Sequence, residues 1–356
     1  MLRHAPLIGI KSSIVKDSNR ILSFDTLSHT KEASKDKYEI NKEKPIDNTS
    51  IIAIHSNLID DQCACCMDSE TFFTLMQKEN PYIQSGFREH TNGSFWNCTK
   101  SIFQLHNDTF NIWTHLLGAL YYLCFIINWL LLENTDTNNN INNNNNTSSN
   151  NSTLPKIYLF YYLLSCFFCF TASTIYHTYR SHSIQVFKRT LMFDVSAIAL
   201  VILAAVNLIL NAELQCYPTV RRLYLFSFLF LIFLAIYMLP IMMRNKKYTM
   251  RTAIFSTLAL QGLASHLLKI YLNQSISEND LKVTVLLLLS YTLFGMGLTI
   301  RRLQIPEKLQ SHTFDIYLSS HQIFHVLVLL GTISILYAFK DSYIYQQNKE
   351  CQLLDL

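Results

Sequence analysis

Three histidines and an aspartate within apolar stretches are the residues of this chain best suited to chemistry. His321 and His325 are four residues apart, so on a helix they project from one face. His177 and Asp194 lie in two other apolar stretches, and Ser173 precedes His177 by one helical turn. Three imidazoles with a fourth position open to water are the ligand set of a catalytic zinc ion. A carboxylate beside such a site could orient the water and accept its proton, because zinc lowers the pKa of bound water to about 7.

The same residues also permit a purely structural role. Ionisable groups inside a membrane span are costly and are functional candidates by default, but histidines on membrane helices also serve packing through hydrogen bonds. Asp194 could pair with a loop arginine such as Arg180, and His115 and His266 are expected to line the bundle interior. The residues alone therefore leave zinc binding and packing open as alternatives.

The candidate residues lie in long apolar runs that define the fold. Half of the 356 residues are hydrophobic and 15% are charged, against about 25% charged residues in soluble domains. A helix needs roughly 20 mainly apolar residues to cross a bilayer. The sequence therefore predicts an all-α membrane protein with a seven-transmembrane-helix bundle within residues 106–340. The expected spans are 111–132, 155–178, 190–211, 219–243, 250–272, 281–300 and 314–338.

The positive charges of the short loops predict how the bundle crosses the membrane. The loops after the second, fourth and sixth spans contain Arg180, Lys188, Arg189, Arg244, Lys246, Lys247, Arg251, Arg301, Arg302 and Lys308, whereas the other loops contain only Lys156, Arg221, Arg222 and Lys282. Lysine and arginine concentrate on the cytosolic side, so we expect a cytosolic N-terminus and an extracellular C-terminus. His177 then lies near the cytosolic end of its span and Asp194 about one turn deep, with His321 and His325 about two to three turns deep.

The segments outside the spans differ in composition. Residues 1–70 are polar and lysine-rich, which predicts a disordered cytosolic tail, and residues 71–105 are expected to include an interfacial helix. Residues 134–153 predict an asparagine-rich extracellular loop, and its sequons predict glycosylation. Residues 341–356 are expected to form a short extracellular tail.

Cysteine usage and charge argue against two other classes of protein. The nine cysteines show no disulfide framework, and only Cys216 and Cys351 are expected on the outer side. The formal net charge of +4 is too small and too dispersed to indicate a nucleic-acid partner.

Several strings of residues carry a family resemblance. They are Glu79-Asn80-Pro81-Tyr82-Ile83, Gly86-Phe87-Arg88, Cys98-Thr99-Lys100-Ser101-Ile102-Phe103, His106-Asn107-Asp108-Thr109-Phe110-Asn111-Ile112-Trp113-Thr114-His115-Leu116-Leu117-Gly118, Ser173-Thr174-Ile175-Tyr176-His177, Phe193-Asp194, Ile305-Pro306-Glu307-Lys308, Phe314-Asp315-Ile316-Tyr317 and Ser320-His321-Gln322-Ile323-Phe324-His325-Val326. On these strings the sequence resembles the progestin and adipoQ receptors, which include the adiponectin receptors and bacterial haemolysin III-like proteins.

The resemblance implies a seven-helix receptor with its N-terminus inside and a zinc ion near the cytosolic face. Carried onto the matching positions, the zinc ligands are His177, His321 and His325, while Asp194 holds the zinc-bound water and Ser173 hydrogen-bonds at the site. The family commonly has a tyrosine and then a glycine soon after the aspartate, where this chain has Val195 and Ala197. The identity of the ligand therefore does not follow from the resemblance.

The resemblance is compatible with three functions. The first is a signalling receptor for an extracellular hormone or steroid, at the plasma membrane or in the Golgi. The second is a zinc-dependent hydrolase of a membrane lipid amide such as ceramide, with Asp194 as the base and with zinc and Ser173 stabilising the oxyanion. The third is an endomembrane scaffold whose N-terminal tail binds a cytosolic partner, since a Golgi-resident relative tethers Raf kinase. We expect a receptor, with hydrolysis as an accompanying activity.

Overall fold

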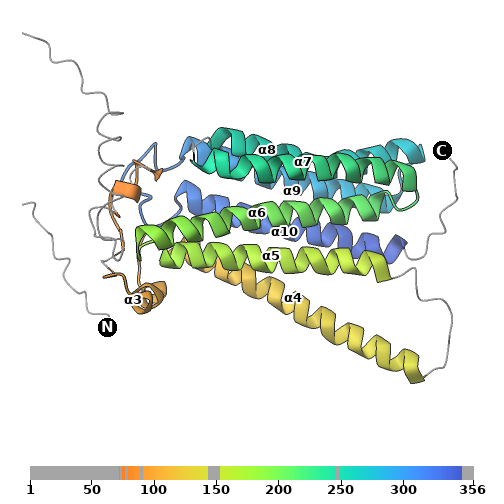
Figure 1. Ribbon diagram of the computed structural model, residues 1–356, viewed down its shortest axis with the longest axis horizontal. Coiled ribbons are helices and arrows are strands. Elements are labelled where there is room, and N and C mark those ends of the chain that lie inside the picture. The colour runs from red at the N-terminus through yellow and green to blue at the C-terminus, as the bar shows by residue number, and fades with distance from the viewer. Residues whose placement is uncertain are drawn as a thin grey trace, which may run out of the picture. The chain divides into compact units, whose positions relative to one another are not determined.

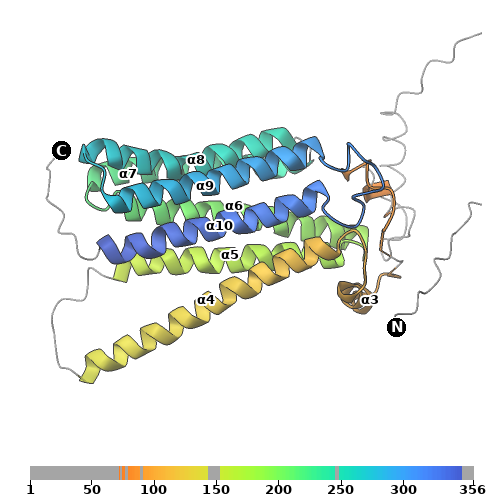
Figure 2. The same ribbon diagram turned by 180° about the vertical axis from the view of Figure 1, so that it is seen from behind.

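The computed structural model describes Phe72 and residues 74–76, 79–88, 91–142, 153–244 and 248–346, all of which belong to the unit Asp61–Leu356. Its long helices are α4 (Thr109–Asn142), α5 (Thr153–Tyr179), α6 (Ile184–Glu213), α7 (Pro218–Arg244), α8 (Tyr248–Asn273), α9 (Glu278–Leu303) and α10 (Ser320–Gln346). A short helix α3 (Phe95–Lys100) and a 3-10 turn (Ser101–Phe103) precede them, and the described residues contain no strand (Figure 1 and Figure 2).

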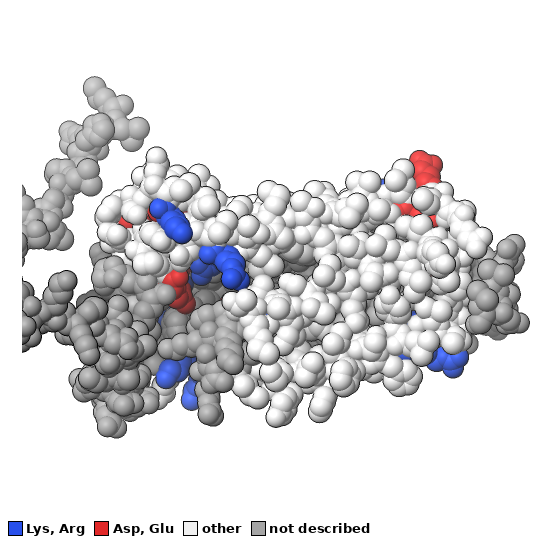
Figure 3. All heavy atoms as spheres, turned by 90° about the horizontal axis from the view of Figure 1, so that it is seen from above, with Lys and Arg blue, Asp and Glu red and all other residues white. Residues whose placement is uncertain are grey.

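Seven of the described helices are long and apolar enough to cross a membrane. Their outward faces carry large apolar side chains, for example Phe226, Phe230 and Phe233 of α7, which are 71%, 67% and 72% exposed. A bilayer covers such side chains, whereas water would leave them exposed. In Figure 3 the charged side chains lie toward the two ends of the described part. The predicted all-α seven-helix bundle is confirmed, and the chain is an integral, multi-pass membrane protein.

Two helices begin six residues from the expected position, because local capping groups decide where they start. α6 begins at Ile184 rather than at 190, since the Ser183 side chain accepts a hydrogen bond from the Val186 N–H. α10 begins at Ser320 rather than at 314, since the Glu307 carboxylate accepts a hydrogen bond from the Ser320 N–H at 2.7 Å.

These starts change the depth of the candidate residues along their helices. Asp194 lies in the third turn of α6, whereas His321 lies in the first turn of α10 and His325 in the second. Measured from the helix ends, Asp194 therefore lies deeper than the two histidines, which is the reverse of the expected order.

Small residues bring α9 and α10 together. A Cβ on Gly331 of α10 would lie 2.5 Å from Cε1 of Phe294 of α9, so only glycine permits this approach without displacing the ring. The Ser290 hydroxyl donates a hydrogen bond to the Gly331 carbonyl at 2.9 Å. Membrane helices associate through such close packing and polar contacts, because lipid leaves little hydrophobic force between them. The contact holds α10, which carries the histidine pair, against α9.

The segments around the spans are described in part. α4 continues to Asn142, past the expected end near 132, and diverges from α5 toward that end in both ribbon views (Figure 1 and Figure 2). The expected tail 1–70, the sequons of the asparagine-rich loop and the chain beyond Gln346 lie outside the described residues. The juxtamembrane stretch contains α3, whose Phe95 and Trp96 are 55% and 66% exposed, as an interfacial helix would require.

Candidate metal centre

Three imidazoles from two helices meet at one end of the bundle. His177 lies in the last turn of α5, and His321 and His325 lie in the first two turns of α10. One ring nitrogen from each falls within 4.8 Å of the other two, which is close enough for the group to hold a metal ion. The Nε2 atoms of His177 and His321 are 3.2 Å apart. The predicted ligand residues therefore lie together, although α5 and α10 are far apart in the sequence.

Hydrogen bonds fix the tautomers of two of these rings. His177 Nδ1 lies 3.1 Å from Oδ1 of Asp108, and His325 Nδ1 lies 3.3 Å from the carbonyl oxygen of Asn111. A carboxylate and a carbonyl can only accept, so both Nδ1 atoms carry the proton and both Nε2 atoms keep a lone pair. A neutral imidazole with its other nitrogen held by a carboxylate or carbonyl is the usual state of a metal ligand in proteins. The residues present therefore fit a zinc ion.

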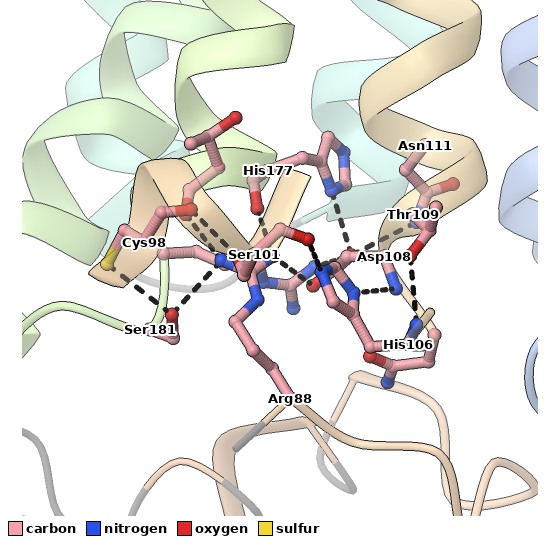
Figure 4. A network of polar contacts seen from close by, with 12 residues as sticks. Arg88, Cys98, Ser101, His106, Asp108, Thr109, Asn111, His177 and Ser181 are labelled. Carbon is pink, nitrogen blue, oxygen red and sulfur yellow. Dashed lines mark hydrogen bonds and ion pairs between the residues drawn. The ribbon is translucent and has the colours of Figure 1, made fainter. Parts of the chain in front are cut away.

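Asp108 is the carboxylate that contacts a candidate ligand, and two arginines keep it ionised. Arg180 Nη1 lies 3.3 Å from Oδ1, and Arg88 Nη2 lies 3.6 Å from Oδ2. Burial alone would raise the pKa of Asp108, but Arg180, the hydrogen bond with His177 and Arg88 together hold that pKa well below its ordinary value. Asp108 is therefore a charged acceptor for the His177 ring, and Figure 4 shows the contact between the two side chains.

His106 fixes the backbone that carries Asp108. Its Nδ1 accepts a hydrogen bond from the Asp108 N–H at 3.1 Å, and its Nε2 lies 3.0 Å from the Ser101 carbonyl, to which it donates (Figure 4). Burial and the nearby Arg88 lower the pKa of His106 to about 4, so the ring is neutral, in agreement with one accepting and one donating nitrogen. The loop before α4 is therefore built to present the Asp108 carboxylate.

Ser173 and Asp194 form a separate pair beside the histidines. The Ser173 side chain of α5 interacts with the Asp194 carboxylate of α6. Within the part of the chain that the structure describes, no hydrogen bond or ion pair joins this pair to the three imidazoles. Arg180, considered above as a partner for Asp194, instead forms ion pairs with Asp108 and Glu79.

The remaining span histidines fall in two places. His115 of α4 stacks on His325, with ring centroids 3.7 Å apart and an interplanar angle of 9°. His266 of α8 lies in a different network, 2.9 Å from Glu213 and 2.8 Å from the Thr284 hydroxyl. Both residues line the bundle interior as expected, and His115 also borders the candidate metal centre.

The site residues predicted from the sequence do not include Asp108. The sequence does contain one signal for it, a carboxylate immediately before an apolar run and within a string that carries the family resemblance. Its partner His177 lies 69 residues away, so spacing along one helix could not indicate the contact.

The fold and this cluster define a class of membrane protein: a seven-helix bundle with three clustered histidines at one end, of which His177 and His325 are buried. Residues 103–336 match the Haemolysin-III-related family. The chain belongs to this family, whose members include the progestin and adipoQ receptors.

Curated relatives agree with this membership. Heptahelical transmembrane protein 1 of Arabidopsis thaliana is 30% identical over 261 residues, which cover 72% of this chain and 75% of the plant protein. The adiponectin receptor protein of Drosophila melanogaster and the progestin and adipoQ receptor-like protein 1 of Caenorhabditis elegans are each 24% identical over 77% of this chain. The matched regions cover 59% of the fly protein and 60% of the worm protein.

Proposed function

We propose that this chain is a seven-transmembrane signalling receptor with a zinc site near the cytosolic face and an accompanying lipid-amide hydrolase activity. The observation that carries the proposal is the group of three imidazoles with ligand atoms within 4.8 Å of one another. The receptor role is supported by the names of the fly and worm relatives, which are receptors or receptor-like proteins. His177, His321 and His325 would hold the zinc.

A cytosolic position for the histidine end is supported by two independent features. The loops at that end are rich in lysine and arginine, as cytosolic loops are. Cys216, which follows the opposite end of α6, is disulfide-bonded. Disulfides persist in oxidising compartments, so the Cys216 end would face outward.

Zinc would supply Lewis acidity at the substrate carbonyl and a more acidic water. Asp194 would accept a proton from the attacking water, and Ser173, one helical turn before His177, would donate a hydrogen bond to the developing oxyanion. The C–N bond of the amide would then break as Asp194 returns that proton to the leaving nitrogen, with release of a fatty acid and an amine. The exposed apolar faces of the helices would let a lipid reach this site from within the bilayer.

Hydrolysis of ceramide by zinc-loaded protein in nanodiscs tests this activity, with released fatty acid as the readout. Asp194→Asn should lower the rate by about 10²–10⁴-fold, because the general base is lost. Ser173→Ala should lower it as well. Ser165→Ala is a matched control, since Ser165 is a buried hydroxyl two turns earlier on α5 that donates to the Tyr161 carbonyl. Absence of fatty-acid release by the zinc-loaded wild type would exclude the hydrolase.

A further inference from the structure

Residues 79–88, here called the strap, lie before the first span and contact both α5 and the segment that leads into α10. At its far end, the Arg88 side chain is 1% exposed. Its Nη2 donates a hydrogen bond to the carbonyl of His177 itself at 2.7 Å, and its Nη1 donates to the next carbonyl, that of Thr178, and to the Ser181 hydroxyl at 3.1 Å. These carbonyls belong to the last turn of α5, where intrahelical donors run out. Arg88 therefore fixes the backbone of His177.

The same guanidinium also reaches the carboxylate that orients the His177 ring. Arg88 Nη2 lies 3.6 Å from Asp108 Oδ2, while Oδ1 of Asp108 contacts His177 Nδ1 at 3.1 Å (Figure 4). Arg88 thus contacts both the main chain of His177 and Asp108, the carboxylate that orients the His177 ring. A planar guanidinium can do this because its donors spread in a fixed fork, which a lysine ammonium does not provide.

The beginning of the strap contacts the segment that leads into α10. Asn80 Nδ2 donates a hydrogen bond to Glu307 Oε1 at 2.7 Å, and Glu307 also caps α10 through the Ser320 N–H. Asn80 is 6% exposed and Glu307 is fully buried, so this contact is shielded from water. His321 follows Ser320 directly, so the strap reaches the α10 ligands through one buried carboxylate.

Further contacts hold the middle of the strap in place. The Ser85 hydroxyl and the Gln84 N–H donate to Oδ2 of the buried Asp315 at 2.5 Å and 3.3 Å. The Gly86 carbonyl accepts a hydrogen bond from the Asn107 N–H at 2.7 Å, next to Asp108. Gly86 has a φ of +70°, a conformation that favours glycine, so the chain can turn here between its two attachments.

We propose that the strap is a positioning element for the three-histidine centre, with Arg88 as its main positioning residue. It sets the spacing between His177 on α5 and the histidine pair on α10, which the bundle otherwise holds on separate helices. The proposal rests on the zinc site proposed above.

Metal binding by the full-length protein in detergent tests this role with Zn²⁺ and Co²⁺ as probes. Arg88→Gln should weaken zinc binding by about tenfold or more, measured by chelator competition, as loss of an outer partner of a metal ligand does. It should also change the visible spectrum of bound Co²⁺, which reports ligand geometry and not overall stability. Arg88→Lys should recover part of the affinity. Arg302→Gln, an exposed arginine at the end of α9, should leave both readouts unchanged.

Asn80→Ala tests the proposal if Arg88→Gln does not fold. It removes the hydrogen bond between Asn80 and Glu307 at the other end of the strap and leaves Arg88 and Glu307 in place. It should weaken zinc binding several-fold. Wild-type zinc affinity and an unchanged Co²⁺ spectrum in the variants that fold would overturn the positioning role while leaving the zinc site intact. A wild type that binds neither metal would instead remove the zinc site, and the positioning role with it.

Discussion

Replacement of Asp108 by asparagine should weaken zinc binding by about 10–100-fold, the usual effect of losing an outer carboxylate partner of a ligand histidine. The carboxylate can only accept, so it fixes the proton of His177 on Nδ1. Asparagine offers a neutral oxygen and two donors, so it no longer specifies that tautomer. It also removes the negative charge between Arg88 and Arg180. Chelator competition on purified protein measures the change.

Asp280→Asn is the matched control for this experiment. Asp280 is also a buried carboxylate with a cationic partner, Lys269 at 2.7 Å, but it lies at the start of α9, at the opposite end of the bundle. Its replacement should leave zinc affinity unchanged even if it lowers stability. Equal zinc affinity in Asp108→Asn and wild type would show that Asp108 does not orient a ligand.

Removal of the Glu307 side chain should strongly lower the free energy of unfolding of the protein. Glu307 is fully buried and accepts hydrogen bonds from Ser320 N–H and Asn80 Nδ2, both at 2.7 Å, and from the Ser320 hydroxyl. Glu307→Ala leaves these donors buried without an acceptor, and hydrogen bonds to charged groups contribute about 1.5–3 kcal/mol each. We expect a loss of about 3 kcal/mol or more in the free energy of unfolding. Thermal unfolding in detergent measures it.

Glu278→Ala is the comparison, because Glu278 is an exposed glutamate in the first turn of α9. Its replacement should change stability by less than about 1 kcal/mol. Similar unfolding temperatures for Glu307→Ala and Glu278→Ala would mean that Glu307 does not hold the start of α10.

The fold could be predicted from the sequence because a membrane imposes a simple requirement on each span. About 20 apolar residues suffice to identify a crossing helix, and the seven runs from 111 to 338 all correspond to helices. The starts of α6 and α10 could not be placed as well. They depend on capping by Ser183 and by Glu307, and Glu307 lies 13 residues before the helix that it caps.

The clustering of His177, His321 and His325 could be predicted because their spacing and their positions along the spans are properties of the sequence. His321 and His325 share a helix face by spacing alone. The partners of the ligands could not be predicted. Asp108 and Arg88 approach His177 from segments 69 and 89 residues away, and only the packed structure brings them together.

Zinc content measured by mass spectrometry on detergent-purified protein tests the central claim most directly, with wild type compared with the His321→Ala/His325→Ala double variant. The three-histidine centre predicts about one zinc per wild-type chain and none in the double variant. A well-folded wild type without zinc, or a double variant that retains it, would contradict the claim and return these histidines to a packing role.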